Sequence, residues 1–379
     1  MSSPRGAVRS RRSVIDVAVI GDGDAVSSAM LRALVTAAAR GVASVGGQQE
    51  ARVGSVVAVG GEPAVVGGVE HRLADPADPS LVQALRGLHA AAYVAASTDL
   101  AGDLQLGPKV RRDRSLRRAQ TVITACAAAG VRHLVVVTGA QVYGAYADNP
   151  LPLADAAPLR APSDGGQVAE LMDVEQLLSI AREVHPGLML TSLRPAALVG
   201  PGVDTVITRH FEAPRLLTLR GAESAWQFCH VDDVGSAVAV VLAQSLQGAV
   251  SAGAPGWLTQ GDLERLTGMR HVELSISAAM ATADRLHRLG VLPTPASDLA
   301  FVAFPWAVSS GLLLDRGWVP VYDNETCVGV LLDTIRGSHA VAARRLDRKD
   351  AALGAASAAV ALVGTAAIMR RRRRKGSPA

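Results

Sequence analysis

The chain has 379 residues, of which 49% are apolar and only 3% are aromatic, and its formal net charge is +4. This length fits one large α/β domain or two smaller ones, and the apolar content allows a sizeable core. The scarcity of aromatic residues argues against a stacking surface for single-stranded nucleic acid. The three cysteines lie far apart, which predicts neither a metal site nor a disulfide framework and fits a reducing cytoplasm.

Most of the positive charge lies at the two ends of the chain. Residues 1–12 hold four arginines, and residues 370–375 hold six basic side chains. Subtracting these ten charges from the net +4 leaves −6, so the globular part is mildly acidic and we expect no nucleic-acid partner. Residues 1–13 are rich in Ser, Arg, Pro and Gly and lack an apolar segment, which predicts a disordered basic N-terminus without a secretory signal.

The first predicted element is a strand over 14–20, followed by Gly21-Asp22-Gly23-Asp24 and a helix over 25–40. This order is typical of the first unit of a dinucleotide-binding fold, in which the helix N-terminus receives a pyrophosphate. The two acids argue against ordinary phosphate binding, because a carboxylate about 4 Å from a phosphate charge costs roughly 4 kcal/mol at an effective dielectric near 20. Asp24 is also a good N-cap residue and could occupy the anion site itself; in the alternative interpretation both acids point to solvent.

Strands and helices then alternate along the chain up to about Gly200. We expect strands over 55–59, 90–95, 133–138 and 189–193, helices over 80–88, 115–129 and 168–183, and a polar loop over 150–166. This alternation predicts an α/β fold with a Rossmann-type, doubly wound parallel sheet. We therefore predict a dinucleotide-binding-like domain over 14–200 and a smaller substrate-side region over 201–340, where the pattern becomes irregular.

The C-terminal end carries an alanine-rich helix pattern over 351–369, where 19 residues have no charge. This length can just span a bilayer, but few large aliphatic side chains support insertion. The basic tail over 370–379 could bind an anionic membrane surface, so that 351–375 anchors the protein at the inner face of the cell membrane. Small residues spaced four apart could also pair such helices into a homodimer or membrane-tethered scaffold. The alternative is a soluble terminal helix on a cytoplasmic protein.

Five groups of residues, in this order along the chain, resemble motifs of one family. They are 68–75 with 91–96; 129–138 with Val142-Tyr143-Gly144; Leu193-Arg194-Pro195 with Gly200-Pro201-Gly202; 228–234; and 317–322 with Glu325. Over residues 14–335 the chain resembles the extended short-chain dehydrogenase/reductases, and among them the NAD-dependent epimerase/dehydratase family that includes UDP-glucose 4-epimerase.

The resemblance implies a bound NAD or NADP and a nucleotide-sugar or other small molecule as substrate. The nucleotide-sugar would lie between the large domain and the region after Gly200. Asp75 would lie near the adenine, and Ala95 and Pro195 would contact the cofactor through their backbones. The remaining implied cofactor residues belong to the turn and the helix start: Gly21, Gly23 and Val26.

The sequence departs from the family at its catalytic residues. The resemblance implies a Ser/Thr, Tyr and Lys trio, with Tyr and Lys four residues apart on one helix face. Here Gly139 stands at the hydroxyl position, Gly165 at the tyrosine position and Ala169 at the lysine position. The second strand ends in Gly60-Gly61, so the usual ribose-binding acid or arginine is also missing. These changes predict weakened cofactor binding and no ordinary Tyr–Lys catalysis.

Three side chains are weak candidates for replacement acid/base groups. Thr138 neighbours the missing hydroxyl, although adjacent strand residues point to opposite faces. Asp173 lies near the empty positions with Glu170, and the alternative for both is a solvated helix face. His230 could be a catalytic base or a structural hydrogen-bonding residue, and Asp232 with Asp233 could cap the helix that follows. We expect no metal site. An active epimerase or oxidoreductase with relocated acid/base residues stays an alternative function.

Overall fold

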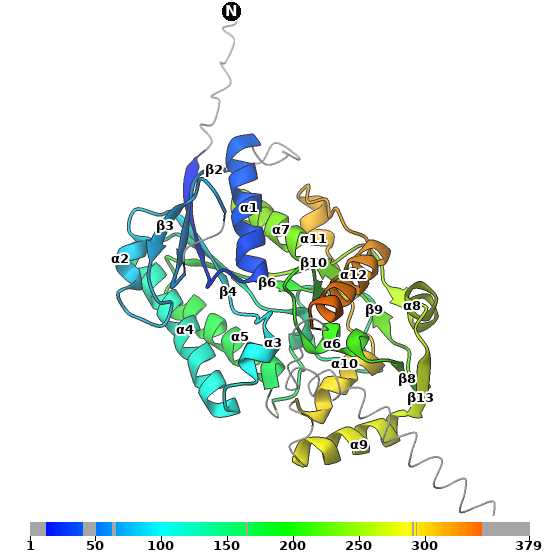
Figure 1. The fold of residues 1–379 in the computed structure, drawn as a ribbon. Helices are drawn as coiled ribbons and strands as arrows, with labels where there is room; N and C mark the ends of the chain where they lie inside the picture. Colours follow the sequence, from blue (N-terminus) through cyan, green and yellow to red (C-terminus); the bar gives the residue numbers. More distant parts are fainter. Residues whose placement is uncertain are drawn as a thin grey trace, which may run out of the picture.

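A seven-stranded parallel sheet lies at the centre of the computed structural model, which describes residues 13–40, 51–62, 66–163, 166–289, 292 and 294–342 (Figure 1). The strand order is β11-β6-β5-β4-β1-β2-β3. Its strands are β1 (Val14–Ile20), β2 (Arg52–Gly60), β3 (Glu70–Leu73), β4 (Ala90–Val94), β5 (His133–Val137), β6 (Met189–Pro195) and β11 (Gly248–Ala252). The order reverses beside β1, as in a doubly wound sheet, and the predicted fold class is confirmed.

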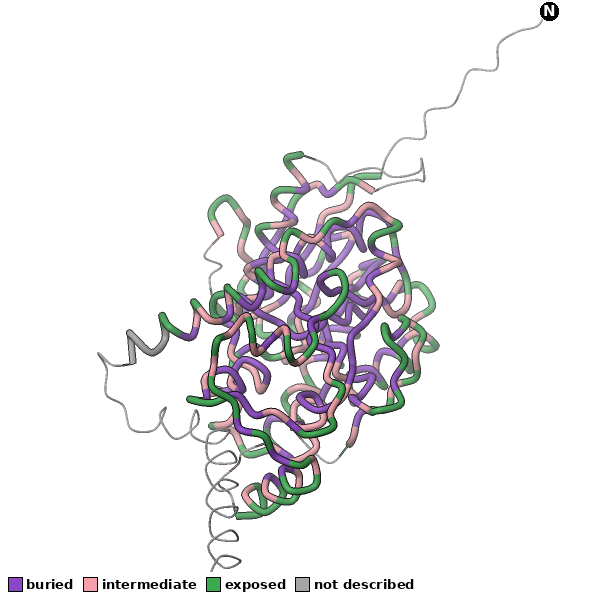
Figure 2. Tube along the Cα trace, turned by 90° about the vertical axis from the view of Figure 1, so that its right-hand side faces the viewer, coloured by how far each residue is buried: buried purple, intermediate pink, exposed green. Residues whose placement is uncertain are grey.

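Alternate residues of each strand enter two separate cores, because successive strand side chains point to opposite faces. Val17 and Val19 pack with helices α1 and α7, whereas Ala18 and Ile20 pack with α2, α4 and α5. These helices are α1 (Ala25–Arg40), α2 (Leu81–Leu85), α4 (Pro108–Ala129), α5 (Gly166–Val184) and α7 (Val231–Ala243). Figure 2 shows the buried chain running through the middle of the molecule, with exposed turns around it.

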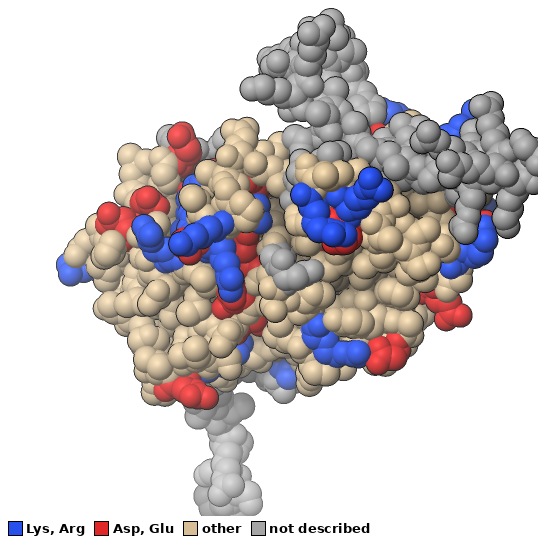
Figure 3. Space-filling view, turned by 90° about the horizontal axis from the view of Figure 1, so that it is seen from below, with Lys and Arg blue, Asp and Glu red and all other residues tan. Residues whose placement is uncertain are grey.

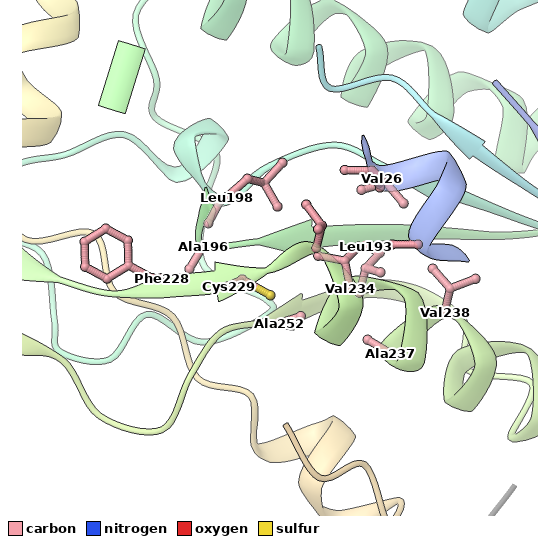
Figure 4. Close-up of a cluster of buried hydrophobic side chains, with 14 of the residues drawn as sticks. Val26, Leu193, Ala196, Leu198, Phe228, Cys229, Val234, Ala237, Val238 and Ala252 are labelled. Carbon is pink, nitrogen blue, oxygen red and sulfur yellow. The ribbon is translucent and has the colours of Figure 1, made fainter. Parts of the chain in front are cut away.

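Helices α1 and α7 touch along their backbones. A Cβ on Gly235 of α7 would lie 2.5 Å from the carbonyl oxygen of Ala29 in α1, which is closer than real Cβ contacts. Figure 4 shows Val26 of α1, and Val234 and Val238 of α7, among the buried side chains around Leu193 of β6. Glycine at 235 is therefore what allows the two helices to pack this tightly.

Beyond the end of β6, the smaller region contains paired short strands, the first of which lies just before Gly200. β8 pairs with β13 in parallel, β9 with β12 antiparallel, and β7 with β10 in parallel. The strands are β7 (Ala197–Val199), β8 (Leu216–Arg220), β9 (Ala225–Trp226), β10 (Phe228–His230), β12 (Leu258–Thr259) and β13 (His271–Ser275). The helices here are α6 (Val206–Glu212), α8 (Gln260–Thr267), α9 (Ile276–Arg288), α10 (Ala300–Ala303), α11 (Gly311–Asp315) and α12 (Asn324–Ala342).

Several predicted segments lie outside the described residues. They are the N-terminus before residue 13, Gly165, the helix over 351–369 and the basic tail over 370–379. Of the helices that the structure does describe, none is both long enough and apolar enough to cross a membrane. Membrane anchoring and dimerisation through 351–375 therefore stay predictions.

Candidate functional site

A cavity of about 550 Å³ opens at the carboxyl ends of the central strands. It lies beside β1 and β4, where the strand order reverses and where open α/β sheets bind their ligands. Its wall includes the turn at Gly21–Asp24, the segment after β4, helix α4, the segment after β5 and the start of α5. Helix α3 (Leu100–Asp103) and α6 close the opposite side.

The turn after β1 places a carboxylate where an anion would bind. Oδ1 of Asp24 accepts the N–H groups of Val26 and Ser27, both at 2.9 Å. Two of the free N–H groups at the start of α1 are therefore satisfied by the protein's own acid. The expectation that Asp24 occupies the anion site is confirmed, and the alternative in which both acids point to solvent is wrong for Asp24.

Asp22, the other acid of the turn, forms an ion pair across the cavity. Nη2 of Arg118, from α4, donates to Oδ2 of Asp22 at 2.5 Å. The two side chains are 23% and 37% exposed. The Nε of Arg118 is buried without a hydrogen-bond partner in the described structure. Sequence reasoning missed this pair because 96 residues separate its members.

Tyr93 places a hydroxyl at the same end of the cavity. Its burial raises the pKa to about 12, and the charges of Arg118, Asp22, Asp24 and Arg114 act on it with smaller, opposing effects. The tyrosine therefore stays protonated at neutral pH, and it contributes a hydroxyl rather than a base to this part of the wall.

Gly60, the last residue of β2, and Gly61, which follows it, differ in whether the packing requires a glycine. A Cβ on Gly60 would overlap the carbonyl oxygen of Gly21, whereas a Cβ on Gly61 would meet nothing within 4 Å. Gly21 donates its N–H to the carbonyl of Val59 at 3.1 Å, which ties the two strand ends together. Close backbone packing thus accounts for Gly60, and only position 61 has room for a ribose-binding side chain.

Of the positions where the family has its catalytic residues, Gly139 lies on the cavity wall and Ala169 does not. Gly139 lines the cavity, and the side-chain oxygen of Gln141 fills the space where a Cβ on Gly139 would lie. Ala169 is 5% exposed and does not line the cavity. Neither position supplies a proton donor or acceptor from its own side chain. Gln141 is a polar cavity residue that the motif comparison did not single out.

Thr138 lines the cavity and belongs to a buried network. Its hydroxyl donates to Glu175 at 2.8 Å and lies 3.1 Å from the hydroxyl of Ser192. Arg194 forms a bidentate ion pair with Glu175, at 2.9 and 2.6 Å, and also donates to the hydroxyl of Tyr143 at 3.0 Å. Burial alone would raise the pKa of Glu175, but Arg194 and the hydroxyl donors hold it below its usual value. The Thr138 hydroxyl is committed to this network.

Asp173 and His230 serve structural roles outside the cavity wall. Asp173 pairs with Arg112 on the outside of α4 and α5, at 2.6 and 2.9 Å. His230 is 3% exposed, caps α7 by accepting the N–H of Asp232, and stacks on Tyr322 with ring centroids 3.7 Å apart. Burial lowers its pKa. The helix begins at Val231 with His230 as its cap, so the expectation of an Asp232 or Asp233 cap is wrong.

Glu170 is the carboxylate of α5 that lines the cavity. Its Oε1 accepts from Nε of Arg111, in α4, at 2.6 Å, and both residues are less than a tenth exposed. Burial raises the pKa of Glu170, and Arg111 partly offsets this. The sequence placed Glu170 beside Asp173 at helical spacing, but the orientation of α5 decides which of the two faces the cavity.

Four of the six predicted cofactor residues lie on the cavity wall. These are Gly21, Gly23, Ala95 and Pro195. Val26 is fully buried behind the turn. Asp75 is exposed and accepts the N–H of Ala77 at 2.8 Å, while its neighbour Pro76 reaches the cavity. Their contacts with a cofactor stay predictions. Within the described ranges, no three His, Cys, Asp or Glu side chains gather in a geometry that could hold a metal ion.

The sequence and the fold are similar to known proteins. Residues 76–253 match the model of the NAD dependent epimerase/dehydratase family. An uncharacterized protein of Mycobacterium tuberculosis is 24% identical over 204 residues, 54% of each chain. The chain thus spans about half the length of the curated relatives it matches.

Two UDP-glucose 4-epimerase structures have the same fold. The Thermotoga maritima enzyme with UDP-glucose has a TM-score of 0.60 at 14% identity, and the Thermus thermophilus enzyme with NAD has 0.60 at 20%. Each comparison covers 86% of this chain and 100% of the other. Residues 76–253 thus match an NAD dependent epimerase/dehydratase domain, and the chain shares its fold with the two epimerases.

Proposed function

We propose that the chain binds a nucleotide, either NAD(P) or a nucleotide-sugar, in the cavity at the strand ends, and that it lacks Tyr–Lys catalysis. Residues 14–200 would hold the nucleotide, and the region over 201–340 would contact the attached group. The cavity volume and the position of four predicted residues on its wall support binding. The family and the solved relatives with NAD and UDP-glucose support the ligand class.

The residues do not fit a dinucleotide held at the start of α1. Asp24 already accepts two of the N–H groups that a pyrophosphate would use. Acids outnumber bases on the described wall: Asp22, Asp24, Asp99, Asp103, Glu170 and Asp298 against Arg111, Arg114 and Arg118. A loss of roughly 4 kcal/mol would move a micromolar dissociation constant to about 1 mM. We therefore expect weak binding.

The observation that carries the loss of catalysis is the state of two of the three catalytic positions, Gly139 and Ala169. Gly139 has no hydroxyl, its neighbour Thr138 donates to Glu175, and Ala169 faces away from the cavity wall. A sugar hydroxyl in the cavity would meet no tyrosine–lysine pair among the described residues. Buried Tyr143 is held by Asp155 and Arg194, so it serves the fold rather than proton transfer.

Calorimetric titration with NAD+ and with UDP-glucose tests this proposal. We expect dissociation constants of about 0.1 mM or weaker for the purified protein. We also expect no nicotinamide absorbance or cofactor mass to co-purify, and no conversion of UDP-glucose in the presence of NAD+. A low-micromolar constant for NAD+, a co-purifying cofactor, or turnover would contradict it.

A second candidate function, an enzyme with a relocated acid/base group, rests on Glu170. This carboxyl lines the cavity, and burial raises its pKa toward the range useful for proton transfer. If turnover is found, Glu170→Gln is expected to abolish it, whereas Asp173→Asn, three residues along the same helix, is expected to leave it unchanged. Equal activity of both variants would exclude Glu170 as the acid/base group.

A further inference from the structure

Three arginines of α4 line the cavity opposite the glycine turn: Arg111, Arg114 and Arg118. Their spacing of three and four residues places them along one helix face. Figure 3 shows basic groups beside acidic ones on a largely uncharged face of the molecule, rather than one broad basic patch. The three arginines, by contrast, share one cavity wall.

The three arginines differ in how fully they are paired. Arg111 is buried in its ion pair with Glu170. Arg118 uses Nη2 on Asp22 and keeps a buried Nε without an acceptor. Arg114 is exposed and has no hydrogen-bond or ion-pair partner in the described structure. Arg114 therefore has free donors for an incoming anion, and Arg118, whose side chain is 23% exposed on the cavity wall, can offer its donors when Asp22 moves away.

The two walls of this end of the cavity offer opposite charges. The α1 side presents Asp22 and Asp24, whose effect on a phosphate is repulsive, and the N–H groups behind Asp24 are taken. The α4 side presents the guanidinium groups of Arg114 and Arg118, which attract a phosphate. Of the two walls, the α4 side is therefore the one that favours an anion.

We propose that Arg114 and Arg118 of α4 form the anion-binding site of this cavity, and that they hold a phosphate or pyrophosphate with Asp22 as the displaceable internal counter-ion. That the phosphate belongs to a nucleotide rests on the proposed function. Guanidinium groups bind phosphate oxygens through paired N–H donors, so the site needs no free helix N-terminus. When no ligand is bound, Asp22 satisfies Arg118.

Other arginines of the same helix supply the control. Arg117 is exposed, lies next to Arg118 in sequence and is absent from the cavity wall. Arg112 pairs with Asp173 outside the cavity. An effect of net charge alone would be the same for Arg117→Gln as for Arg118→Gln. An effect of the site would appear only in the variants of Arg114 and Arg118.

Calorimetry with inorganic pyrophosphate and, separately, with NAD+ tests the inference on the full chain. We expect Arg114→Gln and Arg118→Gln each to weaken pyrophosphate binding about tenfold or more, since a charge-assisted hydrogen bond is worth about 1.5–3 kcal/mol. Asp22→Asn is expected to strengthen it, and Arg117→Gln to change it less than about twofold. Circular dichroism checks that each variant is folded; Arg114 is exposed, so its variant tests the site even if Arg118→Gln unfolds the chain.

The outcomes separate this inference from the proposed function. Pyrophosphate binding that is absent, that survives Arg114→Gln, or that falls equally in Arg117→Gln overturns the arginine site. Weaker binding in Asp22→Asn overturns the role of Asp22 as counter-ion. If NAD+ binds and its dissociation constant is the same in both arginine variants as in the unchanged chain, the nucleotide function stands and the inference fails. If pyrophosphate binds through the arginines while neither NAD+ nor UDP-glucose binds, the inference stands and the proposed function fails.

Discussion

Two arginine–carboxylate pairs of this protein lie in opposite surroundings. Arg194 and Glu175 lie beneath the cavity, with side chains 7% and 2% exposed, and share their remaining hydrogen bonds with Thr138, Ser192 and Tyr143. Arg118 and Asp22 face each other across the cavity mouth at 23% and 37% exposure. The first pair is enclosed and fully bonded, and the second is partly hydrated with one donor unused.

This difference in exposure separates charges that stabilise the fold from charges that can take part in ligand binding. Removing one partner of a buried pair strands the other charge in a medium that cannot solvate it. An exposed pair contributes little to stability, because water replaces the lost partner. We therefore expect substitutions in the first network to affect unfolding, and substitutions at the cavity mouth to affect ligand binding.

The largest expected effect comes from Glu175→Ala. It leaves Arg194 buried without its counter-ion, and we expect the free energy of unfolding to fall by about 3–5 kcal/mol. Urea denaturation followed by circular dichroism measures this loss. The matched control is Asp173→Ala, which breaks the exposed Arg112 pair two residues earlier in α5 and is expected to cost less than about 1 kcal/mol. Equal losses in the two variants would remove the distinction between buried and exposed pairs.

Acid should destabilise the buried regions around His133 and His210. Burial lowers the pKa of His133 and of His210 to about 4 from 6.5. Between these values the unfolded chain binds more protons than the folded one, so stability present above pH 6.5 is lost as the pH falls toward 4. We expect roughly 1–3 kcal/mol from each histidine. In urea denaturation at stepped pH, His210→Phe should make this decline shallower, and an unchanged decline would contradict the assignment to His210.

Gly60→Ala tests the contact between the ends of β1 and β2. Its Cβ would overlap the carbonyl oxygen of Gly21, so we expect a loss of about 1–3 kcal/mol in the free energy of unfolding. Gly61→Ala adds the same atom in open space and should change stability by less than about 0.5 kcal/mol. Denaturation of the two variants side by side decides whether Gly60 is required for packing.

The smallest expected effect belongs to Asp24→Ala, which removes the cap of α1. We expect a cost of about 1 kcal/mol, since two backbone N–H groups lose their acceptor. Asp22→Ala removes an acid of the same turn that caps nothing and should cost less. A thermal unfolding series on these two variants would contradict the capping role if Asp22→Ala proved the more damaging.

Features set by neighbouring residues could be predicted from the sequence, and pairings across the fold could not. The strand at 14–20 and the capping by Asp24 follow from local patterns, and the structure contains both. The sequence also located the altered positions Gly139 and Ala169. It gave no sign that Arg118 reaches Asp22, because a solvated helix face and a cavity wall have the same local composition.

Glu170 and Asp173 show the same limit within one helix. Their spacing of three residues predicts one shared helix face, yet Glu170 faces the cavity and Asp173 pairs outside it. The rotation of α5 about its axis, set by packing against α4 and the sheet, decides between them. Gly60 was interpreted as a lost ribose contact, whereas the structure supplies a steric reason that depends on a strand almost forty residues away.

The close contact of α1 with α7 through Gly235 has a mechanical consequence. With its backbone seated on α7, α1 has no clearance to slide or tilt toward an incoming molecule, and the loop at its start is fastened to β2 through Gly21. The α1 wall of the cavity is therefore the rigid side of the site. Adjustment to ligands of different size falls to the opposite wall, where the long arginine side chains of α4 line the cavity.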